Sequence, residues 1–218
     1  MSFDLERAFE YENGYFATAP INRISKFVTH LELFKQTSGL AGDIVECGVF
    51  KGNSLMHWIK FRALLEHSFS RRIFAFDTFG AFPPSSHSLD IKERDAFIRK
   101  AGGVSESRES ILNRLQSMGL NQNLELIEGD MADTVPEFIK KNEALKISLL
   151  HIDVDLYAPT RLALECFFPK VVRGGVIILD DYGAMPGANK AVDEFFLSSV
   201  TRIKKLPFSH AISFVEKE

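Results

Sequence analysis

The sequence predicts an α/β fold in which helices cover both faces of a mostly parallel β-sheet. Short apolar runs alternate with helical patterns along the chain, which is typical of parallel strands joined by crossover helices. The runs are apolar throughout rather than alternately apolar and polar, which favours strands buried on both faces. Five runs have these properties: residues 43–47, 71–77, 123–130, 146–153 and 174–181.

Amphipathic helical patterns occupy the stretches between and after these runs. Pro136 and Pro159 lie near the start of two of them, where a first turn tolerates proline because its amide is not needed there. Two further strand-like runs, 201–208 and 210–216, follow the last helical pattern. The expected helices are residues 53–67, 134–144, 159–172 with a stop at Pro169, and 189–199.

Two stretches fall outside this alternation. Residues 1–40 form an N-terminal helical segment, with an amphipathic pattern over 21–37, ahead of a domain that spans 41–218. Residues 80–104 form an insertion between the second and third strands that is rich in Pro, Ser and Gly at both ends. Because so long a loop in a compact domain usually has a function, we expect this insertion to be a substrate lid.

The composition excludes several classes of protein. Among the 218 residues, 26 Lys and Arg stand against 29 Asp and Glu, so the formal net charge is −3 and nothing indicates a nucleic-acid partner. No apolar run approaches the ~20 residues that cross a bilayer, and the first residues lack the features of a signal peptide. Cys47 and Cys166 lie in apolar runs and are expected to be buried free thiols. We therefore expect a cytoplasmic protein that does not bind membranes.

All five central runs end in an acid or in an acid close to a glycine, and these acids define the expected site. The carboxyl ends of parallel strands meet at one edge of a sheet, where ligands bind, so these acids should line one pocket. After the first run, glycines allow the backbone to turn sharply toward a ligand, and the next helix offers free N–H groups. The alternative is that these glycines form a plain tight turn with no ligand. An acid where a dinucleotide fingerprint has its first glycine would repel a pyrophosphate and suits a positive or hydroxylated ligand. This group contains Glu46, Gly48, Gly52, Asn53 and Ser54.

Two groups suit an adenosine. Asp77 ends the second run 31 residues after Glu46 (77 − 46) and, with Thr78 beside it, can accept hydrogen bonds from both ribose hydroxyls. The end of the third run is expected to line an adenine pocket, with Asp133 as a helix cap instead of a ligand. The residues expected at the adenine are Gly129, Asp130 and Met131.

The last two runs carry the densest acids. Asp153 ends the fourth run, Asp180 and Asp181 end the fifth, and three carboxylates held together repel one another unless a proton or a cation neutralises them. Oxygen ligands without Cys or paired His favour a hard ion such as Mg²⁺, with Mn²⁺ or Ca²⁺ as alternatives. The alternative is that these acids bind no metal and are solvated or cap helices. His151 lies within the fourth run and is expected to be a core histidine or to support a ligand. His87, in the insertion, is the histidine free to approach a substrate.

Five motifs over residues 40–195 carry a resemblance: GDIVECGVFKGNS, IFAFDTFGAFP, EGDMADTVP, LLHIDVDLYAPT and GGVIILDDYG. Together they resemble the macrocin O-methyltransferase family of class I sugar O-methyltransferases, which depend on S-adenosylmethionine and Mg²⁺. The last two motifs are the most specific, since their spacing of 27 residues (180 − 153) also matches. The resemblance implies a Rossmann-like class I methyltransferase domain with a seven-stranded sheet whose last strand is antiparallel.

The resemblance also implies roles for the strand-end residues. Glu46, Gly48 and Gly52 would hold the methionine part of S-adenosylmethionine, Asp77 its ribose, and the Asp130 region its adenine. Asp153, the implied base, would take a proton from a hydroxyl of a small-molecule substrate, a sugar or related polyol. The implied metal ligands are Asp153, Asp180 and Asp181.

Three alternatives stay open. Catechol-type O-methyltransferases use a similar metal site but have a lysine three residues after the first metal Asp, where this chain has Leu156, so a phenolic acceptor has less support. A nucleotide-dependent oxidoreductase is disfavoured by Glu46 in the glycine loop. The third alternative is a non-catalytic binding module. The base is also open between Asp153, His87 and another residue, and the N-terminal helix offers a surface for a homodimer.

Overall fold

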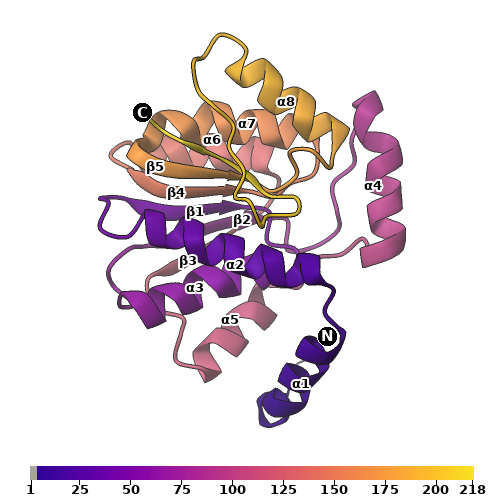
Figure 1. The fold of residues 1–218 in the computed structure, drawn as a ribbon, viewed down its shortest axis with the longest axis vertical. Coiled ribbons are helices and arrows are strands. Elements are labelled where there is room, and N and C mark those ends of the chain that lie inside the picture. The colour runs from indigo at the N-terminus through magenta and orange to yellow at the C-terminus, as the bar shows by residue number, and fades with distance from the viewer. Residues whose placement is uncertain (1–3) are drawn as a thin grey trace.

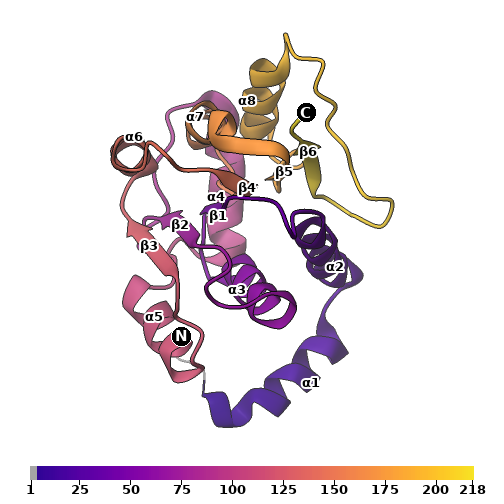
Figure 2. The same cartoon turned by 90° about the vertical axis from the view of Figure 1, so that its left-hand side faces the viewer.

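The structure, a computed structural model, describes residues 4–218 and contains a six-stranded sheet between two layers of helices (Figures 1 and 2). Its strands are β1 (Asp43–Cys47), β2 (Ile73–Asp77), β3 (Leu124–Glu128), β4 (Ile147–Ile152), β5 (Val171–Leu179) and β6 (Ser213–Glu216). Their order in the sheet is β3-β2-β1-β4-β5-β6. The first five strands run parallel, and β6 pairs antiparallel with β5.

The family resemblance implied seven strands, but the sheet within residues 4–218 has six. Of the two strand-like runs expected after the last helix, only the second forms a strand within the described chain, and it is β6. Residues 201–208 pair with β6 at a single position, Lys204. The chain then turns, because the Ser209 amide donates to the Leu206 carbonyl, and Pro207 within this turn has no amide to extend a ladder.

Three helices cover each face of the sheet. One face carries α2 (Ile21–Gln36), α3 (Asn53–Leu65) and α5 (Arg108–Ser117), and the other carries α6 (Met131–Lys141), α7 (Tyr157–Phe167) and α8 (Pro186–Phe196). Leu33 and Phe34 of α2 pack with Trp58 of α3 in the core of the first face. Phe138 of α6 and Phe167 of α7 belong to the core of the second face. Two short 3₁₀ segments lie at Leu5–Arg7 and Phe168–Lys170.

α6 begins three residues earlier than the sequence predicted. Gly129, with φ of 140°, ends β3 sharply, and the carboxylate of Asp130 accepts a hydrogen bond from the Ala132 amide at 2.8 Å. Asp130 is therefore the N-cap. The expectation that Asp133 caps this helix is wrong, and Pro136 lies inside the helix rather than in its first turn.

The insertion at residues 80–104 contains a helix, α4 (Ser88–Ala101), which stands beside the sheet (Figure 1). An antiparallel bridge between Ala81 and Val104 closes the insertion at its base. Asp90 is buried, and its carboxylate accepts a hydrogen bond from the Tyr157 amide at 3.2 Å. Because Tyr157 begins α7, this contact fastens the insertion beside the carboxyl end of β4.

The N-terminal segment divides into two helices with different environments. α1 (Ala8–Thr18) projects away from the body of the molecule and buries none of its side chains (Figures 1 and 2). α2 packs on the sheet and buries His30, Leu33 and Phe34. Cys47 is a buried free thiol and Cys166 a half-buried one. No helix within residues 4–218 is long and apolar enough to cross a membrane.

A glycine at position 48 allows the ends of the central strands to meet. Gly48 has φ of 89°, and an added Cβ would lie 1.8 Å from the carbonyl oxygen of Asp153. The Gly48 amide donates to the Phe76 carbonyl, and the Asp153 amide donates to the Cys47 carbonyl, each at 2.9 Å. These bonds hold β1, β2 and β4 together at an approach that leaves no space for a side chain.

We expect Gly48→Ala to lower the free energy of unfolding by about 3 kcal/mol or more, because a backbone clash adds to the strain of a positive φ. Gly39 is the matched control, with φ of 84° and no atom within 4 Å of an added Cβ. Gly39→Ala should therefore cost only about 1 kcal/mol. Urea unfolding followed by circular dichroism measures both variants. Equal losses would show that the close approach of the strands does not require Gly48.

Candidate active site

Acidic side chains gather where the central strands end. Asp153 directly follows β4 and Asp180 directly follows β5, the neighbouring strand. Asp77 is the last residue of β2, and Asp130 lies two residues beyond β3. The sequence prediction that the strand-end acids share one edge of the sheet is therefore met for these four residues.

An ammonium group from α2 lies between Asp153 and Asp180. Lys26 Nζ is 3.1 Å from Asp153 Oδ2 and 2.8 Å from Asp180 Oδ2. Burial lowers the pKa of Lys26, but the charges of the two carboxylates outweigh it and raise that pKa above its ordinary value. Lys26 therefore keeps its charge and partly neutralises the acids at the place where the sequence predicted a divalent cation.

Asp181 turns toward a second group of carboxylates. Its Oδ2 accepts hydrogen bonds from the amides of Val154 at 3.1 Å and Asp155 at 2.8 Å. One oxygen from each of Asp153, Asp155 and Asp181 lies within 4.8 Å of the other two. Asp155 has φ of 61°, a conformation that side-chain-bearing residues rarely adopt outside functional sites. Of the three predicted metal ligands, Asp153 and Asp181 thus meet with Asp155, whereas Asp180 is joined to Asp153 by the lysine. We call Asp153, Asp155, Asp180 and Asp181 the acid cluster.

Crowding moves the pKa values of the acid cluster in opposite directions. Burial and then the charge of Asp180 raise the pKa of Asp153, and burial with the charge of Asp153 raises the pKa of Asp155 to about 7. Burial and the charge of Asp155 raise the pKa of Asp181. Burial also acts to raise the pKa of Asp180, but the charge of Lys26 outweighs it and holds that pKa well below the ordinary value. Asp180 is thus the carboxylate that stays ionised, and the others call for protons or a cation.

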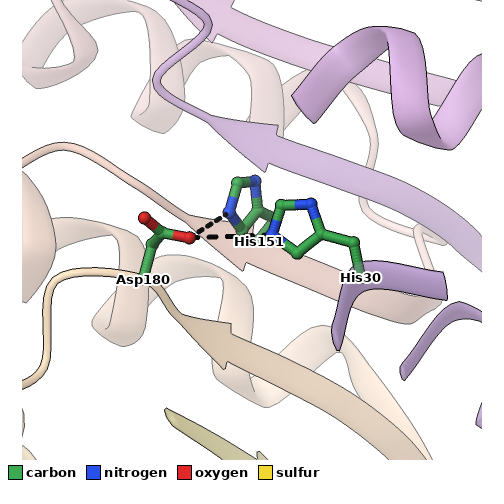
Figure 3. A group of neighbouring side chains, drawn as sticks. All are labelled: His30, His151 and Asp180. Carbon is green, nitrogen blue, oxygen red and sulfur yellow. Dashed lines mark ion pairs between the residues drawn. The ribbon is translucent and has the colours of Figure 1, made fainter. Parts of the chain in front are cut away.

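Two buried histidines lie near Oδ1 of Asp180, the oxygen that does not contact Lys26 (Figure 3). Nε2 of His30, on α2, and Nε2 of His151, on β4, each lie 3.6 Å from Asp180 Oδ1. Burial lowers the pKa of His30 to about 3, so its imidazole is neutral. Burial also acts to lower the pKa of His151, but Asp180 and Glu46 outweigh it and raise that pKa to about 9.

Glu46 lies inside the protein rather than at a strand tip. It is paired with His151 in the register of β1 and β4, and its side chain is fully buried. Its Oε1 lies 3.1 Å from His151 Nδ1 and accepts a hydrogen bond from Trp58 Nε1 at 3.3 Å. Oε2 has no hydrogen-bond partner within residues 4–218. One oxygen thus supports His151, and the predicted contact with the methionine part of a cofactor would use the other.

Asp77 braces the loop between β1 and α3. Its Oδ2 accepts hydrogen bonds from the amides of Val49 at 2.8 Å and Phe50 at 2.9 Å, and its Oδ1 accepts one from the Phe79 amide at 2.7 Å. The Thr78 hydroxyl donates to the backbone carbonyl three residues further on, at 3.1 Å. The predicted bonds to a ribose would therefore use lone pairs that these amides leave on the carboxylate.

The start of α3 presents backbone groups beside this loop. Gly52, with φ of 80°, precedes the helix, and no side chain of the described residues caps its N-terminus. The first-turn amides, at Asn53 and Ser54, therefore lack the usual capping acceptor. Asn53 is exposed and Ser54 is buried. These backbone amides are available to a ligand, so the assignment of this loop to the methionine part of S-adenosylmethionine stays a prediction that the arrangement allows.

The third predicted group lies next to Asp77. The Gly129 amide donates to the Asp77 carbonyl at 3.0 Å, so the ends of β2 and β3 are adjacent. The carboxylate of Asp130 is exposed but caps α6, and Met131 is buried in the core beneath that helix. Contact with an adenine therefore stays a prediction for Gly129, Asp130 and Met131, of which Met131 also packs in the core.

His87, the histidine expected to approach a substrate, is held by two contacts in this structure. Its ring stacks on Tyr157, with ring centroids 4.4 Å apart and 12° between the planes. Its Nδ1 accepts a hydrogen bond from the Leu89 amide at 3.4 Å and caps α4. His87 therefore helps Asp90 to dock the insertion, and it would have to leave this stack to act as a base.

Lys26 and His30 were not among the residues predicted for the site, and Asp155 was not selected either. Lys26 and His30 lie four residues apart, on the same face of α2, and this spacing was the available signal. A strand-end rule does not select residues of a helix that precedes the sheet. Asp155 follows Asp153 by two residues, but its backbone conformation, which directs it toward Asp181, is a property of the folded loop.

The fold is the Rossmann-like fold of methyltransferases. The solved structure of the calicheamicin methyltransferase CalS11 matches with a TM-score of 0.77 and 23% identity, over 99% of this chain and 86% of that chain. The chain belongs to the macrocin-O-methyltransferase (TylF) family, whose model matches residues 18–204.

Two curated relatives are similar in sequence. One, from Streptomyces olivaceus, is 8-demethyl-8-(2,3-dimethoxy-alpha-L-rhamnosyl)-tetracenomycin-C 4'-O-methyltransferase, which is 30% identical over 164 residues, 72% of this chain and 59% of that protein. The other is demethyldecarbamoylnovobiocin O-methyltransferase of Streptomyces niveus, 28% identical over 162 residues, 72% of this chain and 59% of that protein. The chain thus spans about three fifths of the length of the curated relatives it matches.

Removing the ammonium of Lys26 should open the acid cluster to metal ions. We expect Lys26→Gln to bind Mg²⁺ at least about tenfold more tightly, because the competing charge between Asp153 and Asp180 is lost. Calorimetric titration of metal-free protein measures the affinity. Lys35→Gln, on the same helix but paired with exposed Glu32, is the control and should bind Mg²⁺ as the unmodified protein does. Unchanged or weaker binding by Lys26→Gln would mean that Lys26 does not compete with the cation.

Proposed function

We propose that this protein is an O-methyltransferase that uses S-adenosylmethionine and a divalent metal ion to methylate a hydroxyl of a sugar or related polyol. The observation that carries the proposal is the acid cluster, four carboxylates with one lysine, at the carboxyl ends of β4 and β5 in a macrocin-O-methyltransferase family chain. The tetracenomycin relative is named for methylation of a rhamnosyl-bearing compound, which supports a sugar as the acceptor.

The loop after β1 fits the methionine part of S-adenosylmethionine. The start of α3 has no side-chain cap among the described residues and offers backbone amides to the carboxylate of the methionine part. Within residues 4–218 the buried Oε2 of Glu46 has no hydrogen-bond partner, as an acceptor for the ammonium group of the methionine part would. Asp77 and Thr78 lie at the end of the adjacent strand, where the ribose would bind, and Gly129 and Asp130 follow for the adenine.

The acid cluster fits a hard divalent cation. Asp153, Asp180 and Asp181 are the proposed ligands, since carboxylate oxygens are the donors that Mg²⁺ prefers, with Mn²⁺ or Ca²⁺ as alternatives. Lys26 would have to withdraw its ammonium from between Asp153 and Asp180 for the ion to bind. When bound, the ion would stabilise the alkoxide form of the acceptor hydroxyl and so lower its pKa.

Asp153 is the proposed base. Its Oδ2 faces Lys26, so Oδ1 is the oxygen on which it would receive the proton of the acceptor hydroxyl. Burial and the neighbouring charge of Asp180 raise the pKa of Asp153, which favours proton uptake. Asp155 stands beside it as the alternative base, because its pKa is raised to about 7. The deprotonated oxygen would attack the methyl group of S-adenosylmethionine in line, so that the bond from sulfur to methyl breaks as the new C–O bond forms and S-adenosylhomocysteine leaves.

The insertion at residues 80–104 is the proposed substrate lid. Asp90 and His87 dock it on the start of α7, which follows the Asp153–Asp155 loop. Leu89 and Glu93 of α4 line a small space together with Asp155. A lid in this position would cover the acid cluster and exclude water from the bound acceptor.

Replacing one proposed metal ligand tests the function. Asp181→Asn keeps an oxygen for the two amides that Asp181 accepts but removes a charge, so Mg²⁺-dependent kcat/KM should fall at least about 100-fold. The assay uses S-adenosylmethionine, Mg²⁺ and a panel of glycoside, polyol and catechol acceptors. Asp133→Asn, at an exposed acid in the first turn of α6, is the control and should keep full activity.

Three results would each contradict a different part of the proposal. Calorimetry that detects no binding of S-adenosylmethionine would refute the cofactor assignment and the enzyme class with it. Turnover that persists in EDTA, with no gain when Mg²⁺ is added back, would refute the metal role and leave the cofactor intact. Methylation of catechols alone would replace the sugar acceptor with a phenolic one.

We also propose that α1 mediates a homodimer. Phe9 and Phe16 lie seven residues apart on one side of α1 and are 74% and 69% exposed. Light scattering should give a dimer for the unmodified protein and a monomer for the double variant Phe9→Glu/Phe16→Glu. Phe69→Glu, at a residue that is 71% exposed elsewhere on the surface, is the control and should remain dimeric. A monomeric unmodified protein, or a dimeric double variant, would contradict this proposal.

A further inference from the structure

Three buried polar atoms point at one another on the side of Asp180 that faces away from Lys26 (Figure 3). They are His30 Nε2, His151 Nε2 and Asp180 Oδ1, which all lie within 4.8 Å of one another. Each nitrogen is 3.6 Å from the oxygen, which is longer than a hydrogen bond. None of the three atoms has a hydrogen-bond partner among residues 4–218.

Buried polar atoms that make no hydrogen bond indicate room for a further ligand, even where an ion-pair contact at 3.6 Å is present, as between His151 and Asp180. Both histidine side chains are fully buried, and a buried polar group without a partner costs about 1–3 kcal/mol. Native proteins leave few such groups, and here three of them surround the same point. A single ion or small molecule placed at that point would contact all three atoms at once.

The 3.6 Å separation favours a metal ion over a water molecule. An ion at about 2.1 Å from both His30 Nε2 and Asp180 Oδ1 would subtend an angle of about 118° between them, near the tetrahedral value. A water about 2.8 Å from each atom would subtend only about 80°, which is too narrow for two good hydrogen bonds. The same holds for His151 Nε2, which lies at the same distance from the oxygen.

The second nitrogen of each histidine is already held. His151 Nδ1 lies 3.1 Å from Glu46 Oε1, and His30 Nδ1 lies 3.0 Å from His57 Nδ1. Histidines that bind metals usually place their other nitrogen against a carboxylate or another polar group, which fixes the ring and its tautomer. Glu46 and His57 meet that requirement and leave both Nε2 atoms aimed at Asp180 Oδ1.

We propose that His30, His151 and Asp180 form a binding site for a divalent transition-metal ion such as Zn²⁺. Two imidazole nitrogens and one carboxylate oxygen suit Zn²⁺, whereas Mg²⁺ prefers oxygen ligands throughout. Three protein ligands leave one tetrahedral position for a water molecule. We call this the histidine site.

The histidine site joins three elements of the fold. His30 comes from α2, His151 from β4 and Asp180 from the end of β5 (Figure 3). A bound ion would therefore link α2 to the sheet. Asp180 faces the histidine site with Oδ1 and Lys26 with Oδ2. One carboxylate thus serves both sites, and an ion in the histidine site would fix the orientation of Asp180 toward the acid cluster.

Metal uptake by the whole protein tests the proposal. Metal-free protein is dialysed against micromolar Zn²⁺ in the presence of millimolar Mg²⁺, and the bound metal is measured by mass spectrometry. We expect one equivalent of Zn²⁺, and Co²⁺ in its place should give the visible absorption of a tetrahedral ion. His30→Gln and His151→Gln should each weaken Zn²⁺ binding at least about 100-fold.

Two controls separate this site from other metal-binding groups. His67→Gln, at an exposed histidine, should bind Zn²⁺ as the unmodified protein does, and so should Asp181→Asn, which alters only the acid cluster. The proposal would be overturned if the unmodified protein took up no Zn²⁺. It would also be overturned if both glutamine variants took up as much Zn²⁺ as the unmodified protein. Loss of uptake in Asp181→Asn alone would also overturn it, since the ion would then lie among the carboxylates.

Spectroscopy of the unmodified protein covers the case in which the buried glutamine variants fail to fold. X-ray absorption of the zinc-loaded protein should show two imidazole ligands, and a shell of oxygen ligands alone would overturn the proposal. The inference does not depend on methyl transfer. A protein that binds Zn²⁺ here without any binding of S-adenosylmethionine would support the histidine site and contradict only the proposed function.

Discussion

The mutual repulsion of the carboxylates at the ends of β4 and β5 is the constraint on which the rest of this structure depends. Two like charges 4 Å apart near a protein surface repel by about 4 kcal/mol, so Asp153, Asp155, Asp180 and Asp181 cannot all stay charged without cations beside them. The fold relieves this repulsion with Lys26 and with the raised pKa values of three of the four carboxyls. A cluster of acids that needs neutralising in this way would also accept a cation in place of the lysine, which is what the proposed function requires.

α2 supplies what the sheet alone lacks. Lys26 brings a positive charge to Asp153 and Asp180, and His30, one helical turn later, reaches the other oxygen of Asp180. The same helix buries Leu33 and Phe34 in the core beside α3. The charges that balance the acids are therefore held by hydrophobic packing, and the N-terminal segment is part of the site rather than an appendage to it.

Backbone contacts determine where the acids point. Gly48 lets β1 reach the carbonyl of Asp153, and the carboxylate of Asp77 collects the amides of the loop that follows β1. Asp90 does the same for the insertion by accepting the first amide of α7. Because the half-buried carboxylate of Asp77 and the buried carboxylate of Asp90 hold these loops through backbone amides, side-chain-to-backbone hydrogen bonds define much of this edge of the sheet.

The sequence by itself determined the parallel sheet, its strand ends and the acids placed there. An apolar run predicts a buried strand, and the Asp or Gly that follows it predicts where that strand ends. The sequence also determined the family, since five motifs keep their order and spacing. It overestimated the sheet by one strand, because the turn at Leu206–Ser209 prevents residues 201–208 from pairing along β6. Only the tertiary structure decided that Asp180 and Asp181 face different partners, that Glu46 supports His151, and that Lys26 and His30 join the site. These contacts connect residues more than a hundred positions apart or depend on the path of a loop, and no local pattern records which helix packs over which strand end.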